Sequence, residues 1–286
     1  MNNSGNLTDQ LKSVFALIVI PLTLILSYTL FYLVLGNAGN FSNGDPVKGD
    51  PLNYLGIIYK GGVIVPVLIS FFLLVVTFSI ERFITLGKAY GRDSLATFIR
   101  NVKGDVKQGQ IASALQRCER QKGSVGNVIQ AVLKHYTSIV SDTETTREQK
   151  KQAAQQEIEE ALALELPVLE KNLTIIASLA STATLVGLLG TVVGMIKAFA
   201  ALATTGAPDA SALANGISEA LINTALGIAS STLAIWSYNY FTSRIDSLVF
   251  HIDEIGFTIT QQIASATRNK SRAQEIEVLR EENAGV

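Results

Sequence analysis

Four long stretches of the chain are almost entirely apolar, and charged residues mark most of their ends. The windows run over Ser13–Leu35, Gly61–Ile80, Asn172–Ile196 and Ala220–Ser243. Each is long enough for a helix that crosses the hydrocarbon core of a bilayer, which needs about 20 residues. Because backbone groups in lipid must be hydrogen-bonded internally, the windows predict helices rather than loops. The pattern therefore predicts an all-α polytopic membrane protein with four transmembrane helices.

The segments between the windows predict long helical extensions and one short connector. In "NVIQAVLKHY" and "QQEIEEALALELPVLEKNL" apolar residues recur at steps of three and four, which is typical of amphipathic helices. The second of these runs directly into the third window, so we expect one continuous helix there, bent at Pro167. Residues 36–60 are rich in Gly, Asn and Asp-Pro and predict a connecting loop. Asp209 or Ser211 is a candidate N-cap for the fourth helix.

These elements suggest a division of the chain into five parts. Residues 1–60 would hold the first transmembrane helix and an outer loop, and 61–92 the second transmembrane helix. Residues 93–171 would form a cytoplasmic helical region and 172–243 a transmembrane helix pair. Residues 244–286 would form a cytoplasmic helix and tail.

Composition supports a membrane protein and excludes several kinds of site. Hydrophobic residues make up 48% of the chain and charged residues 16%, whereas a soluble domain usually carries about 25% charged residues. The net charge of −1 gives no sign of a nucleic-acid partner. A single cysteine, Cys118, allows neither an intrachain disulfide nor a thiolate metal cage, and we interpret it as an ordinary thiol. His135 and His251 lie outside the windows, so we predict no metal and no cofactor.

The distribution of lysine and arginine predicts the orientation. Fourteen of these residues fall between Arg82 and Lys171 and five follow Ser243, whereas residues 36–60 hold two. By the positive-inside rule, residues 81–171 and the tail are cytoplasmic, the loops 36–60 and 203–212 face outward, and both termini lie inside. The first window could instead be a cleaved signal peptide, but its length and the lack of a clean cleavage motif favour a retained helix.

Small residues are frequent in the third and fourth windows. Gly187, Gly190 and Gly194 recur at steps of three and four, and Gly227 belongs to a similar set in the fourth window. In lipid, such faces let helix backbones approach closely. They would serve packing within one chain or contacts between subunits. Because small residues occur around much of each helix, we favour an oligomer.

Four polar residues in or beside these windows are candidates for function. A threonine can bond back to its own helix, but Thr191 and Thr224 at similar depth indicate a pore. Lys197 lies about 9 Å outward of Thr191, and Glu219 about 7.5 Å outward of Thr224. If the threonines are level, Lys197 and Glu219 are nearly level and could form an ion pair; alternatively, Lys197 extends alone to the headgroups.

Glu219 has a further interpretation, because it shares a helical stripe with Asn215 and Asn223 rather than with Thr224. It could therefore serve an interhelical contact more than a pore lumen. No aspartate lies inside any window. A proton relay normally needs a titratable group near the middle of the membrane. We therefore interpret the chain as part of a channel whose central carboxylate comes from a partner.

"TLVGLLGTVVGMIKAF" followed by "GISEALINTALGIASSTLAIWSYNYF" resembles the paired signature of the MotA/TolQ/ExbB proton-channel family, in particular its ExbB/TolQ branch. "GGVIVPVLISFFLLVVTFSIERF" is similar to the first common span of that branch. The resemblance covers about residues 61–250. Thr184 stands where the family often has proline, and Lys197 stands where a neutral residue is usual. The window Ser13–Leu35 adds a fourth span to the usual three.

The resemblance implies a homopentamer around a dimer of an ExbD-like single-span partner whose aspartate carries the proton. Thr191 and Thr224 would line the pore beside that aspartate, and Glu219 would lie in the outer part of the pathway. The assembly would sit in the bacterial inner membrane and energise a TonB-like periplasm-spanning protein for outer-membrane transport. No covalent chemistry is implied, so the chain would not be an enzyme. Alternatives are a TolQ-like or gliding or stator motor subunit, and a non-conducting membrane scaffold.

Overall fold

The computed structural model describes the backbone of residues 4–141, 146–203 and 209–284. It is 88% helical, and no strand occurs in these ranges. Four helices are long and apolar enough to span a membrane: Phe15–Leu35, Gly62–Ala89, Leu173–Ala203 and Ala210–Gln262. The protein is therefore an all-α membrane protein with four candidate spans, as the apolar windows predict.

The chain divides into two compact units. The membrane unit holds residues 1–82 and 172–240, and the helical unit holds 83–171 and 241–286. The α-helices are α1 (Ser4–Leu30), α2 (Tyr54–Tyr59), α3 (Val65–Ala89), α4 (Leu95–Lys107), α5 (Ile111–Gln121), α6 (Gly123–Ser141), α7 (Arg147–Glu170), α8 (Leu173–Ala203) and α9 (Ala210–Ala284). Short helical turns join them: η1 (Phe31–Leu35), η2 (Ala38–Asn40), η3 (Ser42–Gly44) and η4 (Gly62–Ile64).

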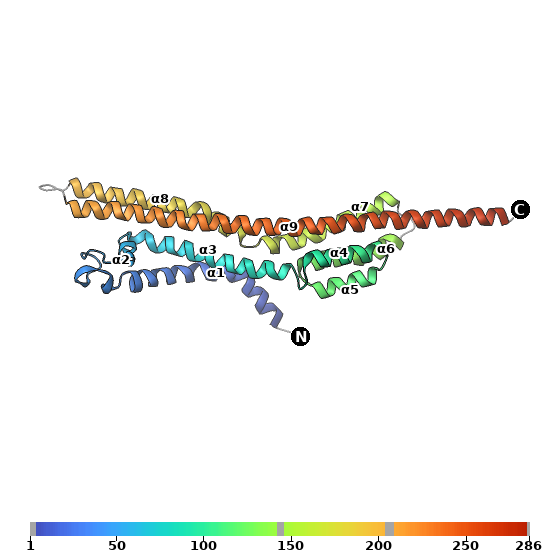
Figure 1. Ribbon diagram of the computed structural model, residues 1–286, viewed down its shortest axis with the longest axis horizontal. Coiled ribbons are helices and arrows are strands. Elements are labelled where there is room, and N and C mark those ends of the chain that lie inside the picture. The colour runs from blue at the N-terminus through green and yellow to red at the C-terminus, as the bar shows by residue number, and fades with distance from the viewer. Residues whose placement is uncertain (1–3, 142–145, 204–208, 285–286) are drawn as a thin grey trace. The chain divides into compact units, whose positions relative to one another are not determined.

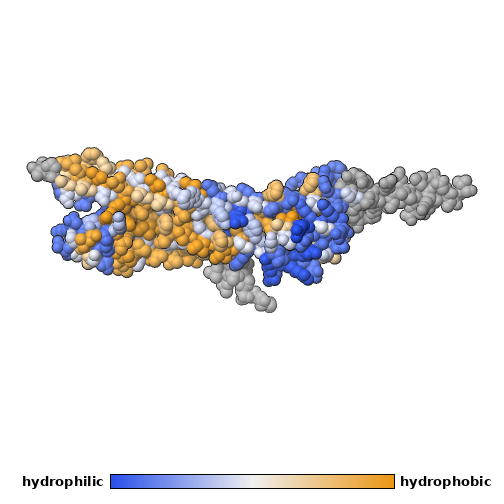
Figure 2. Space-filling model, in the orientation of Figure 1, coloured by the Kyte–Doolittle hydropathy of each residue, from blue (hydrophilic) through white to orange (hydrophobic). Residues whose placement is uncertain are grey.

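Within the membrane unit, α1 lies along α3 and α8 lies along α9 (Figure 1). The buried side chains of the first span fall at every fourth position, on one face of the helix: Val19, Thr23, Ser27, Phe31 and Leu35. Phe31 and Leu35 form a buried cluster with Val65 at the start of α3. Apolar residues dominate the visible surface over these helices (Figure 2), as expected for a surface in contact with lipid.

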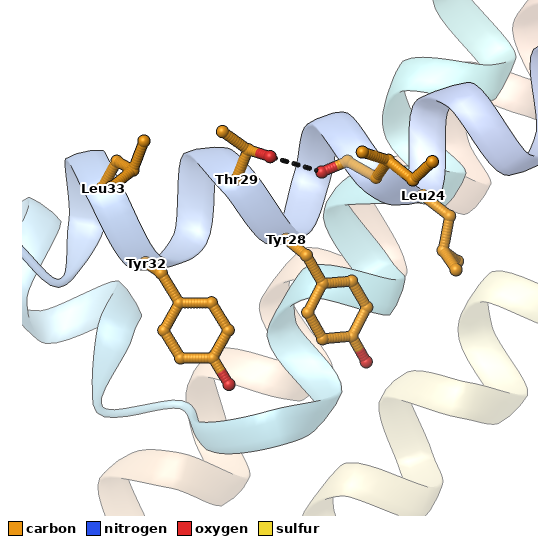
Figure 3. Close-up of a pocket in the computed structure, with 6 residues that line it drawn as sticks. Leu24, Tyr28, Thr29, Tyr32 and Leu33 are labelled. Atoms are coloured by element: carbon orange, nitrogen blue, oxygen red, sulfur yellow. Dashed lines mark hydrogen bonds between the residues drawn. The ribbon is translucent and has the colours of Figure 1, made fainter.

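The opposite face of α1 carries a shallow apolar pocket of about 400 Å³. Its lining comes from α1 and η1 alone: Leu24, Ile25, Tyr28, Thr29, Tyr32 and Leu33. The rings of Tyr28 and Tyr32 extend in the same direction (Figure 3), with centroids 6.4 Å apart. The Thr29 hydroxyl donates back to the carbonyl of Ile25, so it contributes no free polar group to this face.

The segment 36–60 is more ordered than the connector that its composition predicts. The side-chain amide of Asn40 donates to the carbonyls of Val34 and Leu35, and its oxygen accepts from Asn53 Nδ2 at 3.0 Å. These bonds satisfy the carbonyls at the end of the first span, which have no partner within the helix. The segment thus closes the end of the first span, and it contains α2.

The helix expected to continue from α7 into α8 is interrupted, so that prediction was wrong. α7 ends at Glu170, and Asn172 adopts a left-handed conformation with φ of 64° before α8 begins. Asparagine is one of the few non-glycine residues that tolerate this conformation. The side chain of Asn172 donates to Glu81 Oε2 at 3.2 Å, and Glu81 also pairs with the fully buried Arg82. The break is therefore tied to the charged end of the second span.

The helical unit builds its core from amphipathic helices. In α4 the buried apolar residues follow the helical period: Leu95, Phe98, Ile99, Val102 and Val106. The carboxylate of Asp105 accepts hydrogen bonds from Arg117 and Ser113 across α4 and α5. Burial alone would raise the pKa of Asp105, but the hydrogen bonds from Arg117 and Ser113 outweigh it and hold the pKa below its usual value. These bonds fix the α4–α5 pair.

The single thiol lies in the core of the helical unit and is predicted to be unreactive in the folded protein. Cys118 in α5 is 2% exposed, and burial raises its pKa to about 12. Because the thiolate is the nucleophile, maleimide labelling at pH 7.5 should be slow and should become complete in denaturant. A Cys118→Ala, Lys107→Cys double variant places a thiol on an exposed position of α4 and should label at once. Equal labelling rates of the folded wild-type chain and this variant would contradict the buried position.

Candidate functional site

The polar residues singled out in the third and fourth spans meet where α8 and α9 lie side by side. Helix α8 continues to Ala203, so Lys197 lies inside the helix rather than at its end. Helix α9 begins at Ala210, and Asp209 Oδ1 caps it by accepting from the backbone amides of Ser211 and Ala212. Of the two N-cap candidates, Asp209 has this role. Glu219 consequently lies within α9.

Thr191 and Thr224 are in direct contact. The two hydroxyls form a hydrogen bond across the α8–α9 contact. Each hydroxyl also lies within hydrogen-bond distance of a carbonyl of its own helix, Thr191 of Gly187 at 3.3 Å and Thr224 of Ala220 at 3.2 Å. Because each hydroxyl has one hydrogen, one threonine donates to the other while the second donates to its own helix. The structure thus shows both a threonine that is hydrogen-bonded to its own helix and a hydrogen bond between the two helices. Both side chains are half-buried, so they remain accessible from outside this pair of helices.

Lys197 and Glu219 are brought together at the next polar level. Lys197 Nζ lies 2.6 Å from Glu219 Oε1, so the ammonium donates a charge-assisted hydrogen bond to the carboxylate. The Glu219 side chain is 10% exposed, whereas that of Lys197 is 51% exposed. Lys197 and Glu219 therefore lie at the same level along the two antiparallel helices, as expected when Thr191 and Thr224 are level.

The glycines hold α8 and α9 at close range within one chain. A Cβ on Gly187 would lie 3.0 Å from Gly227 Cα, and a Cβ on Gly194 would lie 2.7 Å from Ala220 N. A Cβ on Gly190 would overlap the side chain of Asn223. All four glycines therefore serve the contact inside the chain, and they do not by themselves argue for contacts between subunits.

Two contacts of this site were difficult to predict from the sequence. Asn223 is fully buried, and its Nδ2 donates to the carbonyl of Gly61 at 2.9 Å. Gly62 adopts φ of 78°, and a Cβ there would lie 2.5 Å from Glu219 Oε1. The stripe of Asn215, Glu219 and Asn223 pointed to an interhelical contact, but not to which helix. The Gly61-Gly62 pair before α3 was the available signal for a close approach.

The two histidines lie in the helical unit. His135 Nδ1 is 3.1 Å from Glu157, and His251 Nδ1 is 3.5 Å from Glu254. Glu254 also accepts a hydrogen bond from the ammonium of Lys103 at 2.6 Å, whereas His251 Nδ1 has no hydrogen-bond partner among the described residues. Within the described ranges no group of three or more His, Cys, Asp and Glu side chains is placed to hold a metal ion.

Comparison with known proteins places this site inside a family domain. Residues 121–254 match the model of the MotA/TolQ/ExbB proton channel family. The chain is 31% identical over 111 residues to a biopolymer transport protein ExbB of Xanthomonas campestris, covering 39% of this chain and 44% of that protein. It is 39% identical over 89 residues to the Tol-Pal system protein TolQ of Pseudomonas aeruginosa, covering 31% of this chain and 38% of that protein.

A longer match is found with an ExbB homolog of Methanothermobacter thermautotrophicus, 27% identical over 215 residues, which are 74% of this chain and 71% of that protein. The matches to the Xanthomonas and Pseudomonas proteins span less than half of their lengths. The family model includes α8 and the part of α9 that carries Thr224 and Glu219. Residues 121–254, which include Thr191, Thr224, Lys197 and Glu219, are therefore similar to the MotA/TolQ/ExbB proton channel family.

Proposed function

We propose that the chain is a channel-forming subunit of a proton-driven membrane motor. The observation that carries this proposal is the hydrogen bond between the hydroxyls of Thr191 and Thr224, which joins α8 and α9 inside the family domain. Hydroxyls can both donate and accept, so a pair of them can pass a proton to or from a neighbouring group. The proton-binding aspartate itself comes from an ExbD-like single-span partner.

The proposed assembly is a homopentamer around a dimer of this partner, in the bacterial inner membrane. Residues 172–243 form its pore pair, and the other parts of the chain surround or extend that pair as the sequence suggests. The concentration of lysine and arginine in residues 82–171 supports cytoplasmic termini and an outward-facing segment 36–60. Large exposed apolar side chains on α8, among them Leu185, Leu188 and Leu189, are available for lipid or for neighbouring subunits.

The work that the motor performs is assigned to TonB-type transport across the outer membrane, as in an ExbB-like system. A TolQ-like role, or a gliding or stator motor, is the second candidate, because relatives named ExbB and TolQ both match. A non-conducting scaffold is the third, because close α8–α9 packing needs no proton pathway. A channel or a scaffold performs no covalent chemistry, so neither role is enzymatic.

The decisive experiment measures proton uptake into liposomes that hold the chain with its co-purified partner. Thr191→Val and Thr224→Val each remove a hydroxyl with little change of shape. Loss of one hydrogen bond of about 1.4 kcal/mol in the transport step corresponds to about tenfold slower uptake. Thr77→Val is the matched control, because Thr77 in α3 donates to the carbonyl of Leu73 in its own helix. Uptake that is unchanged in both test variants would remove the two threonines from the proton pathway, whereas a wild-type complex that takes up no protons would eliminate the channel and favour the scaffold.

A further inference from the structure

The segment between the first two spans exposes large apolar side chains although it lies outside both spans. Leu52 is 66% exposed, Tyr54 is 84% exposed and Leu55 is 41% exposed. We call these three residues, which lie at and just before the start of α2, the α2 patch. Single exposed apolar residues are ordinary, but several that lie together indicate contact with a protein or a membrane. The α2 patch therefore indicates a contact with something outside the chain.

Hydrogen bonds fix the backbone that carries the α2 patch. Asn53 Oδ1 caps α2 by accepting from the amide of Gly56, and Asn53 Nδ2 donates to Asn40 Oδ1 at 3.0 Å. The amide of Leu52 donates to the carbonyl of Asn40 at 2.8 Å. The side chain of Asn40 in turn donates to the last carbonyls of η1. The patch is therefore held close to the end of the first span.

The other end of α2 reaches the level of the membrane spans. Ile58 and Tyr59 pack against the buried cluster of Phe31, Leu35 and Val65, and the rings of Phe31 and Tyr59 stack with their centroids 4.6 Å apart. Phe31 lies four residues before the end of the first candidate span. In Figure 1, α2 lies at the end of the membrane unit where α3 begins. This short helix is therefore packed against the ends of the spans.

The packed face of α2 continues into the patch. Residues four apart share a helix face, so Tyr54 lies on the face of Ile58 and Leu55 on that of Tyr59. The apolar face that packs against the spans at the end of α2 is thus continued one turn earlier by two exposed side chains. A surface that is continuous with the apolar ends of the spans meets the same surroundings as those ends, and these surroundings are lipid.

The chemistry of the segment also favours lipid over a charged protein surface. No charged residue occurs in α2, and residues 36–60 hold two aspartates and two lysines, so their net charge is zero. Tyrosine is enriched at membrane–water interfaces, where its apolar ring meets lipid and its hydroxyl meets water. The α2 patch combines such a tyrosine with two leucines.

We propose that the α2 patch lies on the bilayer, with Leu52, Tyr54 and Leu55 at the boundary between headgroups and acyl chains. The leaflet is the one that meets the end of the first span at Leu35 and the start of the second at Gly62. Residues 36–60, which their composition predicts to be a connecting loop, then anchor the first span at a fixed depth. This role does not rest on the proposed channel function.

The test places a tryptophan in the patch of the full-length chain and measures how lipid quenches its fluorescence. Trp236 is the only tryptophan, so Trp236→Phe gives a background without this signal. On that background, Tyr54→Trp replaces one interfacial aromatic residue by another. In nanodiscs whose phosphatidylcholine carries bromine near the top of the acyl chains, its emission should be blue-shifted and should lose most of its intensity. Acrylamide, which stays in water, should quench it weakly.

Two control positions calibrate the two quenchers. Gln116→Trp reports on water, because Gln116 is exposed on α5 and lies outside every candidate span. Tyr32→Trp reports on lipid, because Tyr32 is 56% exposed near the end of the first span. If Tyr54→Trp responds as Gln116→Trp does, the patch lies in water and the proposal fails. If neither quencher affects Tyr54→Trp, protein covers the patch, as a neighbouring subunit would, and the proposal fails as well.

A second pair of changes tests the patch as a unit. Leu52→Ser together with Leu55→Ser removes the two leucines and leaves the reporter tryptophan at position 54. Quenching by brominated lipid should then fall and quenching by acrylamide should rise, while circular dichroism shows that the helices persist. Quenching that stays as before by both reagents would show that the leucines do not hold the segment on lipid, and would overturn the patch as its anchor.

Discussion

Gly194→Leu is expected to separate α8 from α9 and to lower the unfolding temperature of the chain in detergent strongly. An added Cβ at Gly194 would lie 2.7 Å from Ala220 N and 2.8 Å from Gly216 O, which are backbone atoms of the facing helix. Backbone cannot rotate away as a flexible side chain can, so the two helices must move apart. Overpacking of this kind costs about 3 kcal/mol or more, a large share of the stability of a typical protein.

The matched control for this substitution is Gly87→Leu in α3. Gly87 is also a helical glycine, but a Cβ there meets nothing within 4 Å. Because leucine is a better helix former than glycine, helix propensity gives this variant no reason to lose stability. Its thermal unfolding, followed by circular dichroism in the same detergent, should stay close to that of the wild type. Similar unfolding temperatures for the two variants would show that α8 and α9 do not approach this closely.

The second large effect is expected at the Lys197–Glu219 pair. Lys197→Glu places two carboxylates where one ion pair stood, and the Glu219 side chain is 10% exposed whereas that of Lys197 is 51% exposed. Breaking a fully buried ion pair costs about 3 to 5 kcal/mol, and we expect about half of that here because the side chain at position 197 is half exposed. Exchanging the two charges, with Lys197→Glu and Glu219→Lys together, should restore most of the loss.

This charge exchange is measured as thermal stability and as proton uptake of the assembled complex. The coupling between the two positions is the difference between the double variant and the sum of the single variants. A double variant as unstable as the worse single variant would favour the alternative, in which Lys197 extends to the headgroups and its nearness to Glu219 contributes nothing.

The fold follows closely from the apolar windows, and the misplaced boundaries have one cause. The predicted starts of the second and third spans, Gly61 and Asn172, lie one residue before Gly62 and Leu173. The third helix, by contrast, continues past Lys197, whereas the fourth begins beside the predicted N-cap Asp209. A charge marks where burial in lipid becomes costly, but it does not end a helix when a partner on the facing helix neutralises it.

The break at Asn172 and the contacts of Gly61 illustrate what could not be predicted. No glycine or proline marks residues 171–172, and the left-handed Asn172 depends on a side-chain bond to Glu81, ninety-one positions away. The contact of Asn223 with the Gly61 carbonyl is likewise a pairing between distant segments. A single sequence shows which residues share a helix face, as for Glu219 and Asn223, but not which neighbouring helix that face meets.

The contacts that hold the first span determine what the chain loses when this span is absent. In lipid, exposing the faces of α1 and α3 costs little, because lipid tails are as apolar as the side chains they replace. The contacts at the end of the span are specific. The side-chain amide of Asn40 donates to the carbonyls of Val34 and Leu35, and the ring of Phe31 stacks on that of Tyr59 with the centroids 4.6 Å apart. The first span is therefore held mainly by the contacts at its end. A shortened chain that begins after this span would lose those contacts, and the contacts between α8 and α9 would remain.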